Sequence, residues 1–293
     1  MASSDAVQFS APRFRPAGLA FDGVSQRFVI GDALARKLIV VGIGPGHADD
    51  MVRADSAQFD DVAALSIDTR RGDLWVASAA EVGATSAFHR LQLVSGRPLR
   101  MYRVPASLGP VRVVDLVVQP SGGVVALDAA GSRLLWLARG SEEVSVAIHL
   151  QLPGAKSIAN TRSEHIVHIA HDGGIARVDV KARSVTTLAG PKGLALSGFE
   201  AIRMHRDSIV GLQRSSEGAL QLVRLTLNAT GRAVREAAVI DRQIVEGDGR
   251  VVLNITGDEL YYLAIAAPPD GVAREAGDRP AAVPLVIRRL TLR

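Results

Sequence analysis

A unit of strands recurs six times along the chain, and this repeat constrains the fold more than any other feature. Each unit has an apolar strand, a polar turn, a second apolar strand and then a third. The steps between equivalent core positions of the first strands are 46, 51, 42, 44 and 51 residues by subtraction, a mean of about 47. Those positions are held by aliphatic residues: Leu19, Leu65, Leu116, Ile158, Ile202 and Leu253.

A repeat of this length is typical of the four-stranded blades of a β-propeller. The glycines in Gly122-Gly123 and Gly257-Asp258 stand where tight hairpin turns are needed, and no segment has a sustained helical period. The chain of 293 residues therefore predicts one all-β domain, a six-bladed β-propeller with antiparallel blades. The predicted blades are residues 16–60, 61–110, 111–153, 154–196, 197–243 and 244–293.

The two ends of the chain complement each other. The sixth unit has a third strand over 285–290 and then the chain stops, so its fourth strand is missing. Residues 6–10 form an isolated apolar strand before the first unit. Pairing the N-terminal strand into the last blade would close the ring and leave no exposed sheet edge, which is how such folds avoid edge-to-edge association.

The opening strands resemble those of a known class. Pro16-Ala17-Gly18-Leu19-Ala20-Phe21-Asp22, followed by the strands 28–32 and 37–40, is similar to a blade of six-bladed propellers of the NHL-repeat and SMP-30/gluconolactonase type. The resemblance implies a metal-dependent lactone hydrolase whose divalent ion is held by a Glu opening the first blade, an Asn in a middle blade and an Asp in a later one. Here the first blade opens with Arg15-Pro16 and lacks that Glu, whereas Asn160 stands at a suitable place for the Asn.

Charge and composition restrict the classes of partner and of metal site that this chain can have. The net charge is +4, and the basic residues form no stripe interleaved with aromatic residues, which argues against a nucleic-acid partner. The absence of cysteine excludes disulfides and thiolate metal sites. The segment 1–5 has neither a basic region nor an apolar stretch, so we expect no signal peptide in this chain and no membrane span, and the native compartment stays open. We expect a monomer.

The first strand of each blade lines the central channel of a propeller, so polar residues at its opening are the candidate ligand site. These residues are Asp61, Asp115, Asn160, Glu200 and Asp248. Asp61, Asp115, Asn160 and Glu200 are the candidate metal ligands, because their oxygens suit a divalent cation such as Ca²⁺, Mg²⁺, Mn²⁺ or Zn²⁺. The competing interpretation is that these acids are solvated or paired with Arg15, Arg112, Lys156 and Arg203.

Two further features of the sequence are candidate sites. His165, His168 and His171 lie on one strand, where side chains alternate between faces, so they do not converge on one ion. The segment 266–284 carries four prolines and is long for a loop; it would cover a channel mouth, contact a partner, or be disordered.

Two functional hypotheses follow. The first is a non-enzymatic scaffold that binds a protein, a peptide or a small ligand at a channel mouth. The alternative is a divalent-metal-dependent hydrolase of lactones or related esters, which would use the bound ion to polarise a carbonyl group. The fold alone does not choose between them.

Overall fold

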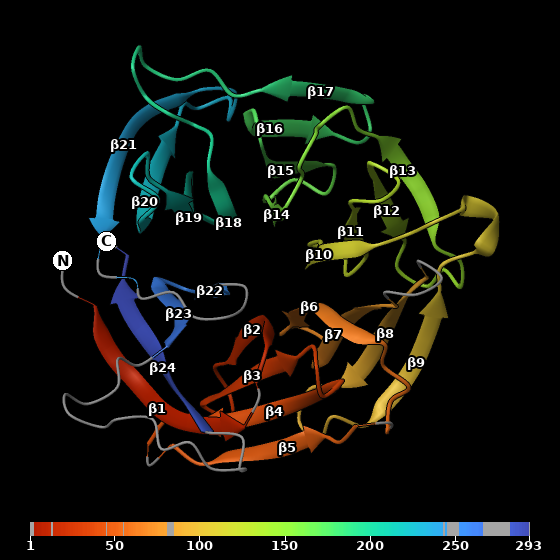
Figure 1. The fold of residues 1–293 in the computed structure, drawn as a ribbon. Helices are drawn as coiled ribbons and strands as arrows, with labels where there is room; N and C mark the ends of the chain where they lie inside the picture. Colours follow the sequence, from red (N-terminus) through yellow and green to blue (C-terminus); the bar gives the residue numbers. More distant parts are fainter. Residues whose placement is uncertain are drawn as a thin grey trace.

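The computed structural model describes residues 3–12, 14–44, 46–54, 56–80, 85–242, 244, 252–265 and 282–292. Within these ranges the elements are strands, apart from one short 3₁₀-helix, Ala106–Leu108. The strands form six four-stranded antiparallel sheets that stand as blades around a central axis (Figure 1). The predicted all-β, six-bladed propeller is therefore confirmed. None of the described helical structure is long and apolar enough to cross a membrane.

In the first five blades, four consecutive strands run from the axis to the rim (Figure 1). Blades 1 and 2 contain β2 (Pro16–Asp22), β3 (Arg27–Asp32), β4 (Lys37–Gly42) and β5 (Ala48–Val52), then β6 (Asp61–Asp68), β7 (Asp73–Ala79), β8 (Ser86–Gln92) and β9 (Pro98–Arg103). Blades 3 and 4 contain β10 (Val113–Val118), β11 (Val124–Asp128), β12 (Arg133–Leu137) and β13 (Ser145–His149), then β14 (Ser157–Asn160), β15 (Ile166–His171), β16 (Gly174–Asp179) and β17 (Ser184–Thr187). Blade 5 contains β18 (Phe199–His205), β19 (Ser208–Arg214), β20 (Leu220–Leu227) and β21 (Val234–Asp241).

Blade 6 is built from both ends of the chain. Its inner strands are β22 (Leu253–Thr256), β23 (Glu259–Ile265) and β24 (Ala282–Thr291), and its outer strand is β1 (Ser4–Pro12). β1 pairs antiparallel with β24, with Phe9 opposite Leu285, and Figure 1 shows the two strands side by side. The predicted closure by the N-terminal strand is confirmed.

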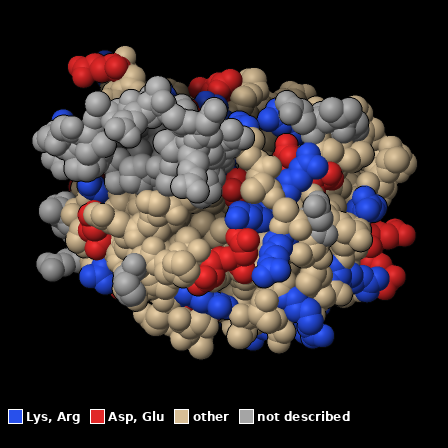
Figure 2. All heavy atoms as spheres, turned by 60° about the horizontal axis from the view of Figure 1, so that its bottom comes forward, with Lys and Arg blue, Asp and Glu red and all other residues tan. Residues whose placement is uncertain are grey.

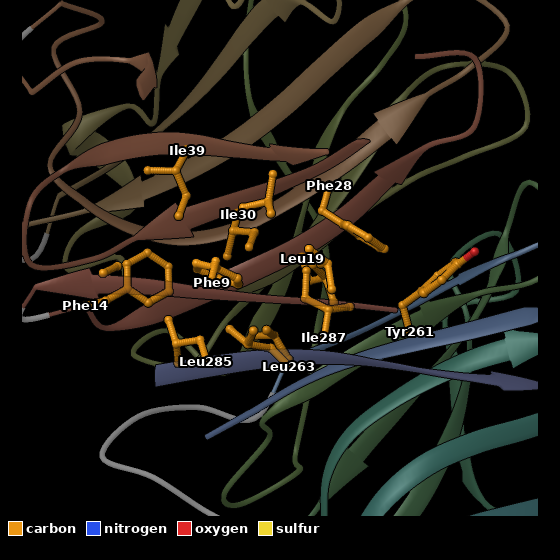
Figure 3. Close-up of a cluster of buried hydrophobic side chains, with 14 of the residues drawn as sticks. Phe9, Phe14, Leu19, Phe28, Ile30, Ile39, Tyr261, Leu263, Leu285 and Ile287 are labelled. Atoms are coloured by element: carbon orange, nitrogen blue, oxygen red, sulfur yellow. The ribbon is translucent and has the colours of Figure 1, made fainter. Parts of the chain in front are cut away.

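Apolar side chains fill the spaces between neighbouring blades. The inner strands read as nearly continuous apolar runs because alternate residues face opposite neighbours: Leu19 packs toward blade 6, whereas Ala20 packs toward blade 2. Figure 3 shows the interface that closes the ring, where side chains of β1, β23 and β24 meet those of β2, β3 and β4. The ring centroids of Phe28 and Tyr261 lie 5.0 Å apart in this cluster. Closure is thus supported by a core as well as by strand pairing.

The propeller has two faces that differ in their connections. We call the face where the first strands begin the entry face, and the face where the first hairpins turn the exit face. On the exit face, hairpins are tied to the next blade by side chains. Arg27 donates to two backbone oxygens of the β8–β9 turn at 3.0 and 2.6 Å, Arg71 donates to the Ser121 oxygen at 2.6 Å, and Arg206 pairs with Asp258 at 2.7 Å. These links hold neighbouring blades in register.

Candidate functional site

A β-bulge near the entry face determines which side chains reach the central channel. Four of the first strands shift register against their partners close to their start, and each shift leaves one extra residue in the first strand. All four extra residues line the channel: Ala17, Ala63, Val114 and Glu200. Only Glu200 among them carries a carboxylate, so the bulges do not build an acidic ring.

The channel is narrow and its walls are unequal. Its volume is about 30 Å³. A water molecule needs roughly 10–15 Å³ of such space, whereas sites for small organic ligands run from about 300 Å³ upward. The described wall residues of blades 6, 1 and 2 are all apolar, while blades 3, 4 and 5 contribute Asp115, Ser157, Glu200 and Arg203. The channel therefore has room for about two water molecules or an ion, and not for a sugar or a lactone ring.

An ion pair between blades 3 and 5 crosses the channel. The guanidinium of Arg203 donates to Oδ2 of Asp115 at 3.0 Å and to Oδ1 at 3.3 Å. The same carboxylate accepts hydrogen bonds from the Ser157 hydroxyl at 2.7 Å and from the Ile158 backbone N–H at 3.0 Å. Both oxygens of the buried Asp115 are thus used by groups of the protein, and the cation that neutralises it is an arginine.

The second carboxylate of the mouth is also paired. Lys156 Nζ lies 3.1 Å from Glu200 Oε1 and 4.0 Å from Asp172, and Arg214 Nε lies 3.9 Å from Glu200 Oε1. The Glu200 side chain is 34% exposed, so this network faces solvent at the entry mouth. The mouth balances three acids with three bases, namely Asp115, Asp172 and Glu200 with Lys156, Arg203 and Arg214. Among the described residues, the mouth therefore has no excess negative charge to attract a divalent cation.

The other candidate residues lie elsewhere. Asp61 does not line the channel; it pairs with Arg36 at 3.0 Å between blades 1 and 2. Asn160 is the last residue of the short strand β14, and its amide donates to the Val118 oxygen at 2.7 Å, toward the exit face. The opening position of β14 belongs instead to Ser157. Asp248 and most of the segment 266–284 lie outside the described residues.

The donor set does not fit the divalent cation that the resemblance implies. In the described part of the chain, no group of three or more His, Asp or Glu side chains converges as a metal site. Asp115 and Glu200 are the two candidate ligands that share the channel mouth, and both face cationic side chains of the protein. A metal bound by Asp115 would have to displace Arg203 from its carboxylate.

His168 and His171 of blade 4 contact different neighbours. His168 is buried, and its Nε2 lies 3.4 Å from the Gly231 oxygen on blade 5. Burial lowers the pKa of His168 to about 4, so its ring is neutral near pH 7. His171 lies at the end of β15, where its Nδ1 accepts a hydrogen bond from the Gly173 N–H at 3.2 Å.

A second hollow lies on the exit face and was not foreseen from the sequence. It is a cleft of about 370 Å³ between blades 2 and 3. Four arginines and two aromatic residues are in its wall: Arg71, Arg90, Arg100, Arg139, Trp75 and Tyr102. Part of this set follows from strand geometry, because Trp75 and Arg90 are cross-strand partners and Arg100 and Tyr102 are two residues apart on β9.

On the face that Figure 2 shows, basic and acidic side chains are interspersed.

Comparisons with known proteins bear on the fold. No family model and no curated protein sequence matches the chain. Many solved structures match it along most of its length. The calcium-binding protein regucalcin from Agrobacterium tumefaciens is 16% identical in sequence. The match covers 97% of this chain and 93% of the regucalcin chain, with a TM-score of 0.59. A gluconolactonase from Xanthomonas campestris is 10% identical, with 94% and 86% covered and a TM-score of 0.61. A chain of a nidogen/laminin complex is 9% identical, with 78% and 86% covered and a TM-score of 0.56.

These likenesses establish the architecture. The chain has the six-bladed propeller fold found in regucalcin and gluconolactonase, as the resemblance of its first blades implied. Enzyme names predominate among the similar structures, which include sugar dehydrogenases and a lactonase. At such low identity the likeness is one of fold, and the activity has to be argued from the site.

Proposed function

We propose that the protein is a non-enzymatic binding propeller, in which the closed channel is a rigid structural core and a loop face holds a small ligand. The observation that carries this proposal is the pairing of Arg203 with Asp115. The buried carboxylate best placed to hold a catalytic ion at the channel mouth is saturated by a guanidinium, a hydroxyl and a backbone N–H. An arginine keeps its charge at all ordinary pH values, so it does not vacate this position by losing a proton.

The size of the channel supports the same proposal. Its volume of about 30 Å³ leaves no space in which a lactone or ester could be enclosed beside Asp115. The polar groups of the mouth are satisfied by one another, as Lys156, Glu200 and Arg214 are. Such a network stabilises the mouth, and it leaves none of the described carboxylates that line the channel unpaired for use as a general base.

A metal-dependent lactone hydrolase is the second candidate function. It is favoured by the fold shared with a gluconolactonase and with a calcium-binding protein. Asp115 and Glu200 line one cavity, and they are the residues that would have to hold the ion. For this activity Arg203 must leave Asp115 when the ion binds, and that requirement distinguishes the two candidates.

The test is a comparison of thermal melts and ligand recovery. The protein is treated with a chelator and melted with and without Ca²⁺, Mg²⁺, Mn²⁺ and Zn²⁺. An ion present at a hundred times its Kd would stabilise the fold by about 2.7 kcal/mol, which raises the Tm of a chain this long by roughly 2 °C or more. We expect no ion-selective rise for the wild-type protein. In parallel, the protein is incubated with a panel of small acids and lactones, separated from unbound compounds and analysed by mass spectrometry.

We expect a bound compound to be recovered chemically unchanged and to saturate at a fixed stoichiometry. An ion-selective rise of the Tm, together with hydrolysis of a lactone that is lost in Asp115→Asn, would overturn the proposal and establish the hydrolase. If none of the compounds in the panel binds, that result would also count against a small-ligand function.

A further inference from the structure

The cleft between blades 2 and 3 has the size and the wall of a ligand site. Its volume of about 370 Å³ lies within the range of roughly 300–1,000 Å³ that is usual for small-molecule sites. It is formed on the exit face by the first hairpins of the two blades, the outer strand β9 and the β12–β13 turn. It is therefore separated from the channel mouth by the depth of the propeller.

The wall of the cleft is strongly basic. It contains Arg71, Arg90, Arg100 and Arg139, and Asp73 is its only acidic residue among those described. Arg139 forms no ion pair or hydrogen bond through its side chain among the described residues, and it is exposed at the β12–β13 turn. Arg100 pairs with Glu142 at 2.6 Å, but the Glu142 side chain is 72% exposed. An exposed pair of this kind contributes little, so an anion in the cleft can replace Glu142.

The other two arginines are held in place by buried acids. Arg71 lies 2.7 Å from Asp68, and Arg90 lies 2.8 Å from Asp73; both carboxylates are 6% exposed. Arg71 also donates to the Ser121 oxygen on blade 3, so it spans the boundary between the blades. These contacts fix the two guanidinium groups before any ligand arrives, which lowers the entropy cost of binding.

The floor of the cleft is aromatic. Trp75 and Tyr102 stack with their ring centroids 5.7 Å apart, and the Arg100 guanidinium lies 5.2 Å from the Tyr102 ring centroid. The Nε1–H of Trp75 is buried and has no acceptor in the described part of the chain. Leu99, 42% exposed, adds an apolar surface at the opening. The two rings and Leu99 together offer an apolar surface against which a flat ligand can lie.

We propose that this cleft binds a small organic anion, a carboxylate or phosphate group carried on a flat apolar body. The anionic group lies between Arg139 and Arg100, where planar guanidinium groups match its oxygens. The apolar body lies over Trp75 and Leu99. The inference assigns a site to the ligand-binding function proposed above, but it stands on the cleft alone and does not depend on how the channel works.

The test uses the intrinsic fluorescence of the cleft. The chain has two tryptophans, and Trp136 does not line the cleft. The variant Trp136→Phe therefore leaves Trp75 as the only tryptophan reporter. This protein is titrated with phenyl phosphate and benzoate, with inorganic phosphate to separate the anion from the ring, and with benzylamine as a cationic control. We expect saturable changes with the two aromatic anions, weaker binding of inorganic phosphate and none of benzylamine.

Substitutions locate the site. Arg139→Ala and Arg100→Ala, each made in the Trp136→Phe background, remove exposed side chains, and each is expected to weaken binding of phenyl phosphate about tenfold or more. Arg162→Ala is the matched control, because Arg162 is an exposed arginine in the β14–β15 turn of the same face, outside the cleft. It should leave the Kd unchanged. Raising the ionic strength should weaken binding to the parent protein more than to Arg139→Ala.

Three results would overturn the inference: no saturable response to either aromatic anion, equal Kd values for Arg139→Ala and its parent, or an equal loss in Arg162→Ala. Tight binding of inorganic phosphate without any gain from the ring would reject the flat apolar body. A metal-dependent lactonase activity would overturn the proposed function and leave the affinity of the cleft for anions unaffected, so the two failures are distinguishable.

Discussion

Arg203 reaches across the channel from blade 5 and places its guanidinium 3.0 and 3.3 Å from the two carboxylate oxygens of Asp115 on blade 3. The two residues are 88 positions apart in the chain. Because Asp115 also accepts hydrogen bonds from blade 4, this one carboxylate joins three consecutive blades at the axis. The pair therefore acts as an internal clamp between blades 3, 4 and 5.

The clamp predicts a marked asymmetry between single and double substitutions. Asp115→Ala removes the carboxylate that neutralises Arg203 and accepts from the Ser157 hydroxyl, so that Arg203 keeps only uncharged acceptors such as the Ile202 oxygen. It should lower the free energy of unfolding by about 2–4 kcal/mol. Asp115→Leu combined with Arg203→Met replaces both charges with apolar groups, and should cost less than Asp115→Ala alone. Urea unfolding of the three proteins measures these values. Equal stability of Asp115→Ala and the wild type would contradict the clamp.

Ring closure predicts that β1 is needed for the stability of the whole propeller. Deleting residues 1–10 would expose the edge of β24 and remove Val7 and Phe9 from the core, at a cost of about 4 kcal/mol or more from burial alone. Calorimetry should show a lower Tm, and size-exclusion chromatography should show association through the freed edge. Phe9→Ala and the exposed Gln8→Ala form a matched pair on the same strand, and only the first should destabilise the fold. An unchanged Tm for the deletion would refute the closure model.

A close approach between blades 1 and 2 predicts that Gly18 does not tolerate a side chain. A Cβ at this position would lie 2.8 Å from Leu65 Cγ and 2.9 Å from the Leu65 backbone nitrogen. Gly18→Ala should therefore destabilise the protein by about 1–3 kcal/mol, because the backbone of β6 has to move. Gly23→Ala is the control, since a Cβ there meets nothing within 4 Å. The prediction fails if both variants unfold at the same denaturant concentration.

Buried histidines predict a loss of stability in mild acid. His89 is buried, with Nε2 2.8 Å from the Ser78 hydroxyl oxygen. Burial, with a further contribution from the Arg103 charge, lowers the pKa of His89 to about 4 from 6.5. Between these two values the unfolded chain binds more protons than the folded one, so stability is complete above about pH 6.5 and falls as the pH drops toward 4.

The expected loss from His89 is about 3 kcal/mol by pH 4. Urea unfolding at pH 7.5, 5 and 4 measures it. His89→Gln should show a shallower dependence on pH than the wild type, while keeping part of it because the pKa of His168 is lowered in the same way. Parallel pH profiles for the two proteins would show that His89 has no part in the acid sensitivity.

Much of the strand order was predictable from local sequence. The strands expected over 28–32 and 37–40 fall within β3 and β4, because apolar runs between turn residues mark strands that are largely buried. The outer strands were harder to recognise. β5 and β17 are short and partly exposed: β5 contains two adjacent aspartates, and β17 has a single apolar residue, so neither is marked by an apolar run.

The candidate site was predictable only in part. Glu200 and Asp115 do lie at the channel mouth, as their positions early in the first strands suggested. Asn160 lies toward the other end because β14 has only four residues and begins at Ser157. The bulges also affect the site, because one extra residue changes which side chain faces the axis. Their positions could not be predicted, because no turn residue in the sequence marks them.

The amino-acid sequence by itself determined the number of blades, the strand order within them and the closure of the ring, because these depend on the local alternation of apolar residues and on the spacing of turns. Only the tertiary structure decided which charges meet. It paired Arg203 with Asp115 across the axis, and it gathered Arg71, Arg90, Arg100 and Arg139 at one cleft although they form no cluster in the sequence. The physical reason is that a contact between charged side chains depends on the distance between them in space. For residues far apart in the chain, that distance is set only when the blades have packed against one another.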